Sequence, residues 1–186
     1  MSTLIEPVVT VADLELMPEN GSRYEVIEGE LFVSKAPGVT HQRALMRLML
    51  ILSKYLEGNS VGEILSTVGF VPDELNGVIP DLIFIAACRI LEVIVGQRLV
   101  AAPDLVVEIL SPGPQNERRD RIAKRQLYGR FGVSGYWILN TEAHTVEICM
   151  LEGQALKDKA ILSENDELTS PLLPGFRCKV SDIFSI

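Results

Sequence analysis

The sequence predicts an α/β or mixed α+β fold, and three features of the chain lead to this prediction. Strand-like apolar runs occur on both sides of a basic, helix-like segment. A long helix with a wide apolar stripe precedes most of these runs. The chain has 186 residues and 47% hydrophobic content, which suffices for one compact core but would be cramped for two. We therefore expect a single domain over residues 1–186, with a central sheet flanked by helices.

The elements follow in order along the chain. Residues 11–16 are expected to form a short helix that ends near Pro18, and residues 23–33 alternate as a hairpin around a Glu28-Gly29 turn. A core helix closed by Gly58 is expected over residues 41–58. The C-terminal residues from 170 onwards are expected to form a closing loop and a short terminal element. Strand-like runs cover residues 63–71, 80–86, 98–110, 135–140 and 145–151, with the basic helix at 116–131.

Cysteine use and hydropathy indicate a cytoplasmic protein. The three cysteines lie far apart and form no C-x-x-C pair, so they suggest neither a disulfide framework nor a zinc site. The first residues are acidic and do not resemble a secretory signal. The longest apolar stretches fall well short of the roughly 20 residues that a membrane helix needs. We expect no membrane partner.

The charge is unevenly distributed. The net charge of −8 argues against a surface devoted to polyanions, but residues 115–130 contain six basic side chains and only two acidic ones. Arg118, Arg121 and Arg125 cluster on one side of this predicted helix, where a solvated charge face is the ordinary expectation. They are also the candidate contacts to nucleic acid, and a homodimer would double this basic rim.

Glu108 interrupts a run that otherwise has the composition of a buried strand, "DLVVEIL". A carboxylate is almost never fully buried unless another group pairs with it. Asp81 stands at the start of a second apolar strand, "PDLIFIA", and two strands can bring the two acids together. Such a pair is stabilised by protonation of one acid or by a divalent cation such as Mg²⁺. Alternatively, Asp81 caps a turn after Pro80, and Glu108 pairs with an arginine of the basic helix.

Lys124 lies within the apolar face of the basic helix. A lysine directed toward a sheet is costly unless its ammonium reaches an anion or a point where negative charge develops. The alternative is that its chain extends past the apolar stripe to water. At about 100° per residue, one arc of this helix contains Ala123, Lys124, Leu127, Tyr128 and Phe131.

These residues carry a family resemblance. Pro80-Asp81, Glu108 in a strand and Lys124 on the next helix resemble the PD-(D/E)XK restriction-endonuclease-like superfamily. More closely, "RYEVIEGEL", "THQRAL", "IPDLIFI", "APDLVVEILSPG", "RDRIAKRQLYGRFGV" and "GYWILN" resemble a large bacterial family of uncharacterised nuclease-like proteins within it. The resemblance spans nearly the whole chain and implies a restriction-endonuclease-like core with a mixed sheet.

The resemblance also implies a site. Asp81, Glu108 and the backbone carbonyl of Ile109 would hold Mg²⁺ or Mn²⁺, and Lys124 would orient or activate the attacking water. The usual superfamily signature has its lysine two residues after the glutamate, where this chain has Leu110. The close family moves that lysine to the following helix, at the position that Lys124 occupies.

Three further residues have weaker claims to the site. Glu25 is a possible additional acid or the structural partner of an arginine. Asp104 belongs to a second Pro-Asp pair on the same strand as Glu108 and is interpreted as a supporting or strand-start residue. His41 is in phase with Leu45 and the later leucines of the long helix, so we interpret it as a packed or capping residue rather than a ligand.

The sequence thus predicts a Mg²⁺-dependent nuclease that hydrolyses phosphodiester bonds of nucleic acid, with DNA as the expected substrate. The alternative is a catalytically silent binding or assembly module with the same fold, which the net acidity of the chain favours.

Overall fold

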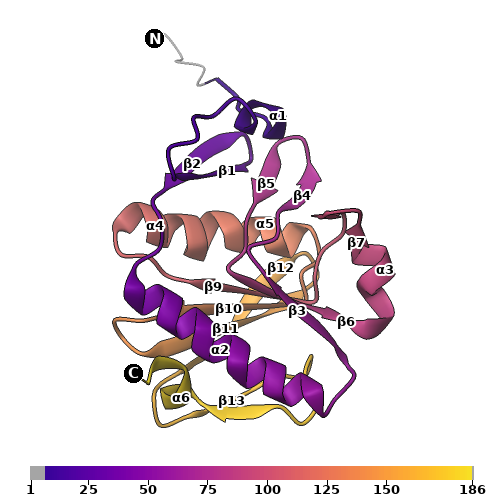
Figure 1. Ribbon diagram of the computed structural model, residues 1–186, viewed down its shortest axis with the longest axis vertical. Coiled ribbons are helices and arrows are strands. Elements are labelled where there is room, and N and C mark those ends of the chain that lie inside the picture. The colour runs from indigo at the N-terminus through magenta and orange to yellow at the C-terminus, as the bar shows by residue number, and fades with distance from the viewer. Residues whose placement is uncertain (1–6, 186) are drawn as a thin grey trace.

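The structure is a computed structural model that describes residues 7–185. Its strands form two six-stranded sheets and one small hairpin (Figure 1). The larger sheet has the order β12-β11-β10-β9-β6-β3, and its only parallel pair is β9 with β10. Its strands are β3 (Gly62–Ser66), β6 (Leu82–Ala86), β9 (Leu105–Ile109), β10 (Gly135–Asn140), β11 (Thr145–Glu152) and β12 (Ala155–Leu162).

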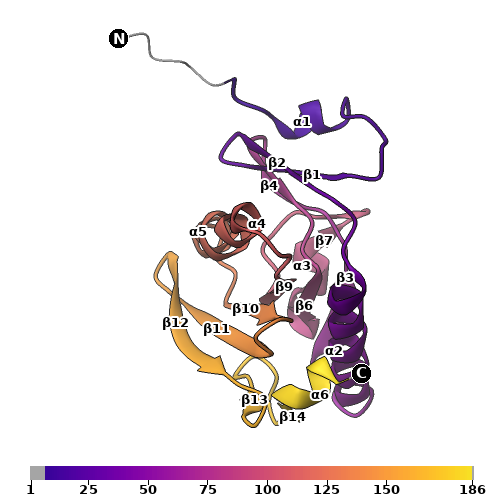
Figure 2. The same cartoon turned by 90° about the vertical axis from the view of Figure 1, so that its left-hand side faces the viewer.

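The smaller sheet has the order β2-β1-β5-β4-β8-β7 and lies beyond one end of the larger sheet (Figures 1 and 2). Its strands are β1 (Arg23–Ile27), β2 (Glu30–Ser34), β4 (Phe70–Asp73), β5 (Asn76–Val78), β7 (Ile94–Val95) and β8 (Arg98–Leu99). The remaining elements are α1 (Val11–Leu14), η1 (Ala87–Arg89), α3 (Ile90–Val93), β13 (Glu167–Thr169), β14 (Arg177–Lys179) and α6 (Val180–Phe184).

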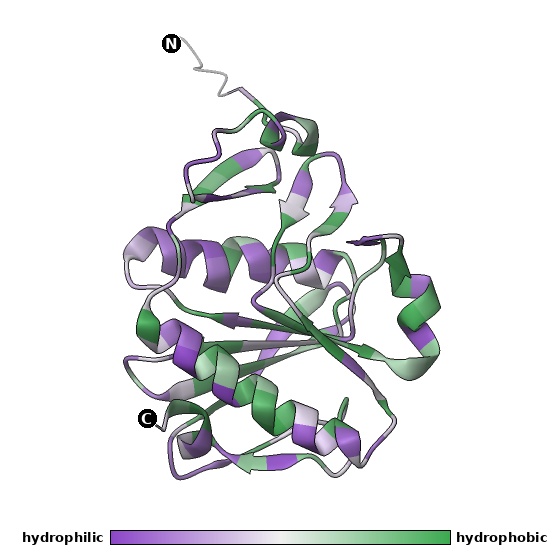
Figure 3. Ribbon diagram, in the orientation of Figure 1, coloured by the Kyte–Doolittle hydropathy of each residue, from purple (hydrophilic) through white to green (hydrophobic). Residues whose placement is uncertain are grey.

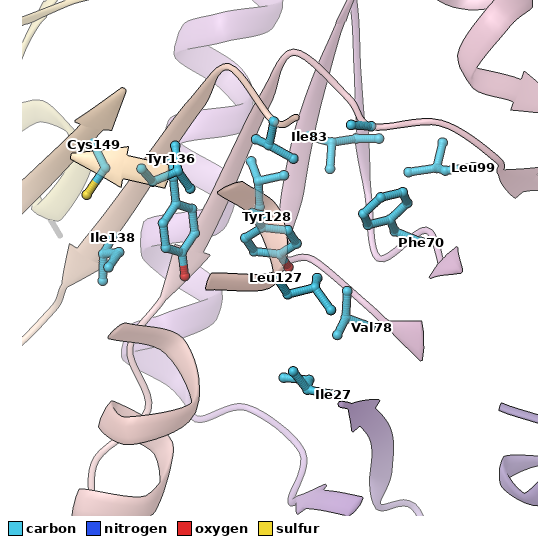
Figure 4. Packing of buried hydrophobic residues seen from close by; sticks show 14 of the residues in the cluster. Ile27, Phe70, Val78, Ile83, Leu99, Leu127, Tyr128, Tyr136, Ile138 and Cys149 are labelled. Atoms are coloured by element: carbon cyan, nitrogen blue, oxygen red, sulfur yellow. The ribbon is translucent and has the colours of Figure 1, made fainter. Parts of the chain in front are cut away.

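Helices cover both faces of the larger sheet. The long helix α2 (Val39–Glu57) packs on one face, and the helical stretch Pro114–Arg130 lies on the other (Figures 1 and 2). Alternation along β9 divides its side chains between them. Leu105, Val107 and Ile109 join the core beneath α2, whereas Val106 and Leu110 join the core beneath the second helix. Figure 4 shows part of that second core, in which Tyr128 and Tyr136 lie among aliphatic side chains.

The helical stretch opposite α2 is not a regular α-helix. It consists of α4 (Pro114–Arg118), a π-helical segment η2 (Arg119–Lys124) and α5 (Arg125–Arg130). The helix that the sequence predicts at 116–131 is therefore present, with a π turn in its middle. π turns occur frequently at functional sites. Figure 3 shows that this stretch is mainly hydrophilic, whereas the strands beneath it are mainly hydrophobic.

Two predicted strands are each divided between the sheets. The run 63–71 breaks at Thr67, whose φ of 55° is incompatible with a continuous strand, so β3 and β4 belong to different sheets. The run 98–110 breaks before Pro103, which has no N–H to donate to a ladder, and it becomes β8 and β9. The prediction of one continuous strand was therefore wrong for each of these two runs.

Other differences lie at the edges of elements. The first helix ends at Leu14, two residues earlier than expected, and its capping box joins Thr10 and Asp13. The hairpin turn is as expected, because Glu28 and Gly29 both have positive φ values, as a tight hairpin turn requires. The sequence did not predict β12, which is an edge strand whose side chains are mostly exposed. The mixed α+β architecture itself confirms the predicted fold class.

None of the helices within residues 7–185 is long and apolar enough to span a membrane.

Candidate active site

Strand pairing brings Asp81 and Glu108 to the same point. β6 and β9 are antiparallel, with Leu82 opposite Val107 and Ile83 opposite Val106. Continuing this register by one residue sets Asp81 opposite Glu108, and directly opposite residues of neighbouring strands present their side chains on the same face. That face is the one covered by the Pro114–Arg130 helix, because Glu108 alternates in phase with Val106 and Leu110.

Asp81 is buried and held by several donors. Its Oδ2 accepts a hydrogen bond of 2.9 Å from the Ile109 amide, and its Oδ1 accepts one of 3.2 Å from Arg23. The Nε2 atom of His41 lies 3.4 Å from the same Oδ1. Burial alone would raise the pKa of Asp81, but His41, the Ile109 amide and Lys124 outweigh it and lower the pKa to about 2. Asp81 is therefore ionised at neutral pH.

Lys124 is the partner that a buried Glu108 requires. Its side chain comes from the π-helical segment, is fully buried, and lies with Nζ 2.9 Å from Glu108 Oε1. The same ammonium is 2.8 Å from Glu25 Oε1. Burial would lower the pKa of Lys124, but Glu108, Glu25 and Asp120 outweigh it and raise the pKa above its usual value. Lys124 therefore remains a cation inside the protein.

Glu25 connects the smaller sheet with the Lys124–Glu108 pair. It lies on β1, is 1% exposed, and its Oε1 also accepts a hydrogen bond of 2.8 Å from the Ile79 amide. The sequence offered two roles for Glu25, an additional acid of the site or the partner of an arginine. In the structure its nearest cation is Lys124, and Arg119 is farther away at 3.9 Å.

Glu108 carries its hydrogen bonds on one oxygen. Tyr128 Oη donates to Oε1 at 2.7 Å, so this atom accepts from both Tyr128 and Lys124. Within residues 7–185 no hydrogen bond is made to Oε2. Burial raises the pKa of Glu108 to about 8, against the effect of Lys124 and with further contributions from Asp81, Asp120 and Glu25. A proton on Oε2 is compatible with both hydrogen bonds to Oε1.

Sequence reasoning missed Asp120 and Arg119. Both are buried in the π-helical segment, where Arg119 donates to Asp120 through Nε at 2.7 Å and through Nη2 at 3.0 Å. Asp120 Oδ1 is 3.9 Å from the Lys124 ammonium. The spacing of four residues between Asp120 and Lys124 was the available signal, because such residues share one helix face.

The balance of charge in this cluster depends on the protonation of Glu108. Four acids, Glu25, Asp81, Glu108 and Asp120, lie beside three permanent cations, Arg23, Arg119 and Lys124. One negative charge is in excess when all are ionised. A proton on Glu108 or a bound divalent cation compensates it, and oxygen donors suit a hard cation. As the side chains stand in the described range, no three histidine, cysteine or acidic side chains are grouped closely enough to enclose an ion.

Two residues of the cluster each line a cavity. Arg23 lines a cavity of about 400 Å³ together with apolar residues of α1, β4 and β5, including Val11, Leu14 and Val71. Arg119 lines a smaller one of about 160 Å³ between β2 and the start of the basic helix. Arg23 and Arg119 therefore each connect the buried charges with a cavity.

The three arginines assigned to nucleic acid lie outside this cluster, and each has a carboxylate partner in the chain. Arg118 pairs with Glu30 at 3.2 Å, and Arg125 pairs with Asp158 at 2.8 Å. Arg121 bridges two acids at the helix surface, Glu117 and Glu147. Their exposure decreases from Arg118, at 64% for the side chain, to Arg125, at 26%.

Comparison with known proteins gives a family. The model of the Uma2 family, described as "putative restriction endonuclease", matches residues 11–181, which is most of the chain. The chain belongs to this family. The Uma2 description and the mixed α+β architecture agree with the restriction-endonuclease-like superfamily that the motifs resemble. Membership of this family suggests a nuclease function.

One solved structure resembles this Uma2 protein over nearly its full length. It is a protein from Anabaena variabilis ATCC 29413, titled a putative nuclease belonging to DUF820. It matches with a TM-score of 0.78 and 16% sequence identity, over 95% of this chain and 98% of the other. At that identity the likeness shows a shared fold. The curated proteins contain no significant match.

Proposed function

We propose that this protein is a metal-dependent nuclease that hydrolyses phosphodiester bonds of nucleic acid, with DNA as its substrate. The observation that carries the proposal is the buried Lys124 ammonium, which lies between Glu25 and Glu108 on the face where Asp81 opposes Glu108. Buried ionisable groups with strongly shifted pKa values and specific charge partners cluster at functional sites, and Glu108 and Lys124 are such groups.

The proposed roles follow from the donors present. Asp81, Glu108 and the Ile109 carbonyl would hold Mg²⁺ or Mn²⁺, with Glu108 contributing the Oε2 atom that Lys124 and Tyr128 leave free. When bound, the cation would stabilise negative charge that develops on the phosphate. Glu25 fixes the position of Lys124, and Lys124 orients the attacking water and offsets charge on the phosphate oxygens.

We propose that Arg118, Arg121 and Arg125 contact the phosphate backbone, which their position on the helix surface supports. Phosphates would have to replace the carboxylates that pair with these arginines, so we expect binding to be weak per protomer. A homodimer would double the number of contacts. The free thiols of Cys88, Cys149 and Cys178 support action in a reducing cytoplasm.

A cleavage assay tests the proposal. The wild type is incubated with single- and double-stranded DNA and with RNA, in Mg²⁺, in Mn²⁺ and in EDTA. We expect cleavage that requires the metal, loss of cleavage in Glu108→Gln, and a large decrease in rate in Lys124→Ala with nearly unchanged affinity. The triple change of Arg118, Arg121 and Arg125 to Ala should weaken binding and flatten its salt dependence.

The same assay can refute the proposal. If the folded wild type neither cuts nor binds any nucleic acid with either metal, the chain is a catalytically silent module of the same fold. The buried Lys124–Glu108 pair would then be a structural feature only.

A further inference from the structure

The cavity beside Arg23 is a mainly apolar space between α1 and strands of the smaller sheet. Its volume is about 400 Å³, and the ring of Tyr24 on β1 adds an aromatic side chain to its aliphatic wall. Pockets that bind small organic groups have volumes of roughly 300–1,000 Å³ and combine an apolar lining with a few polar groups. The cavity has this size and character, and the proposed reaction does not use it.

This cavity shares parts of its wall with the candidate active site. Arg23 lines it, and the Nη1 atom of Arg23 donates to Asp81 Oδ1 at 3.2 Å. Ile79 also lines it, and the Ile79 amide donates at 2.8 Å to Glu25 Oε1, the atom that contacts Lys124. A group inside the cavity would therefore contact residues that are themselves bonded to two acids of the site.

The lining carries more positive than negative charge. Among the described residues it contains two arginines, Arg23 and Arg98, and one acid, Glu15. Arg98 is exposed on β8 and forms no ion pair with a carboxylate in the range 7–185. An anion can therefore pair with Arg98 without displacing a carboxylate, in contrast to the three arginines on the surface of the basic helix.

We propose that this cavity binds one unstacked base of the substrate strand, and that the protein consequently acts on single-stranded nucleic acid. The inference rests on the proposed function and specifies the form of its substrate. A base has flat apolar faces that suit an apolar wall with an aromatic ring, and stacking on such a ring tolerates any base. The phosphate attached to that base is the anion that Arg98 would bind, and Arg23 connects the base with Asp81.

The form of the substrate follows from the shape of a duplex. A base in a duplex is stacked and paired, so it reaches a pocket only when it is turned out of the helix, which costs free energy. A base in a single strand avoids most of this cost. The competing explanation is that the protein holds phosphates alone and that the cavity contains only water. In that case a strand without bases would bind as tightly as an intact one, because both carry the same charge.

Gly69 provides a way to fill the cavity. It lines the cavity, and a Cβ added to it would meet no atom within 4 Å, so Gly69→Leu occupies space without a clash at that atom. Gly58→Leu is the matched control. Gly58 is the C-cap of α2, outside the cavity lining, and its added Cβ would make an ordinary contact of 3.9 Å with the Tyr55 carbonyl. Thermal melting checks that both variants are folded.

Fluorescence anisotropy in EDTA, where metal-dependent cleavage does not occur, measures the contribution of the bases. A single-stranded oligothymidylate is compared with a sugar-phosphate strand of the same length that has no bases. We expect the wild type and Gly58→Leu to bind the intact strand roughly tenfold or more tightly than the base-free strand. Gly69→Leu should lose most of this ratio, and a duplex of the same length should bind the wild type more weakly than the single strand.

Photocrosslinking locates the base in the wild type and needs no variant. A strand that carries 5-iodouracil is irradiated on the protein, and we expect mass spectrometry to find the crosslink at Tyr24 or another residue of the cavity lining. Equal affinity for the intact and base-free strands, tighter binding of the duplex, crosslinks only outside the cavity, or an unchanged ratio in folded Gly69→Leu would each overturn this inference. Metal-dependent cleavage by the wild type would still support the proposed function in those cases. A wild type that neither binds nor cuts nucleic acid overturns both proposals.

Discussion

Two of the three Pro-Asp pairs of the chain, Pro80-Asp81 and Pro103-Asp104, lie at opposite ends of one pair of strands and make nearly the same local contacts. Asp81 precedes β6 and accepts a hydrogen bond from the Ile109 amide at the end of β9. Asp104 precedes β9 and accepts one from the Ala86 amide at the end of β6, at 2.8 Å. Each also pairs with an arginine, Arg23 for Asp81 and Arg89 for Asp104.

The surroundings of the two aspartates differ. At the Asp104 end, the charged residues that pair within residues 7–185 are Arg89 and Glu92. The Arg89 side chain is 27% exposed, so its pair with Asp104 is a strand-end contact that water reaches. At the Asp81 end, Glu108, Glu25, Asp120 and Lys124 are all buried. Pro103-Asp104 therefore serves as a strand cap, and the additional buried charges distinguish the candidate site at Asp81 from it.

The largest expected difference between the two ends concerns their cations. Lys124→Met removes the ammonium from among three buried acids, and we expect the free energy of unfolding to fall by about 3–5 kcal/mol. Urea denaturation at pH 7 measures this loss. A loss below about 1 kcal/mol would show that the acids are already neutral without Lys124.

Divalent cations should stabilise the protein through the Asp81 end and not through the Asp104 end. Mg²⁺ or Mn²⁺ at a hundred times its dissociation constant should stabilise the wild type by about 2.7 kcal/mol. We expect the melting temperature to rise likewise in Asp104→Ala and to stay unchanged in Asp81→Ala. Equal shifts in Asp81→Ala and the wild type would contradict a metal site at Asp81.

The pH dependence of stability should reflect Glu108. Its pKa is raised to about 8 in the folded protein from 4.5, so the folded state keeps a proton that the unfolded chain has lost between these values. The stabilisation is complete below pH 4.5 and is lost as the pH rises toward 8, by at most about 1.4 kcal/mol per pH unit. In EDTA, Glu108→Gln should lack this decrease and should therefore gain stability relative to the wild type as the pH rises. Parallel stability curves for the two proteins would mean that Glu108 is ionised throughout.

The smallest effect is expected at the Asp104 end. Arg89→Met breaks a partly exposed ion pair, and the cost should be about 1 kcal/mol or less. Urea denaturation at pH 7 measures this cost. The comparison with Lys124→Met is matched, because methionine replaces a basic residue in both variants. A cost as large as that of Lys124→Met would remove the contrast between the two ends.

Much of the site could be predicted because its residues break local patterns. Glu108 stands out in an apolar strand, and Lys124 stands out on the apolar arc of a helix. Asp120 was missed although it lies four residues before Lys124, because the abundance of charge in that segment made it look like part of a solvated face. His41 was in phase with leucines, so nothing in the sequence indicated that its ring would be left without a hydrogen-bond partner beside Asp81.

The sequence by itself determined which residues face inward. The alternation of side chains along β9 and the helical period of the segment that carries Lys124 are local properties, and both can be read from the order of apolar and polar residues. Only the tertiary structure decided which Pro-Asp pair meets Glu108. Antiparallel pairing sets the start of β6 against the end of β9, so Asp81 joins Glu108, whereas Asp104 is carried to the other end of its own strand. Tertiary packing also brought Glu25 from the smaller sheet and paired Arg118, Arg121 and Arg125 with distant acids, since such contacts join residues far apart in the chain.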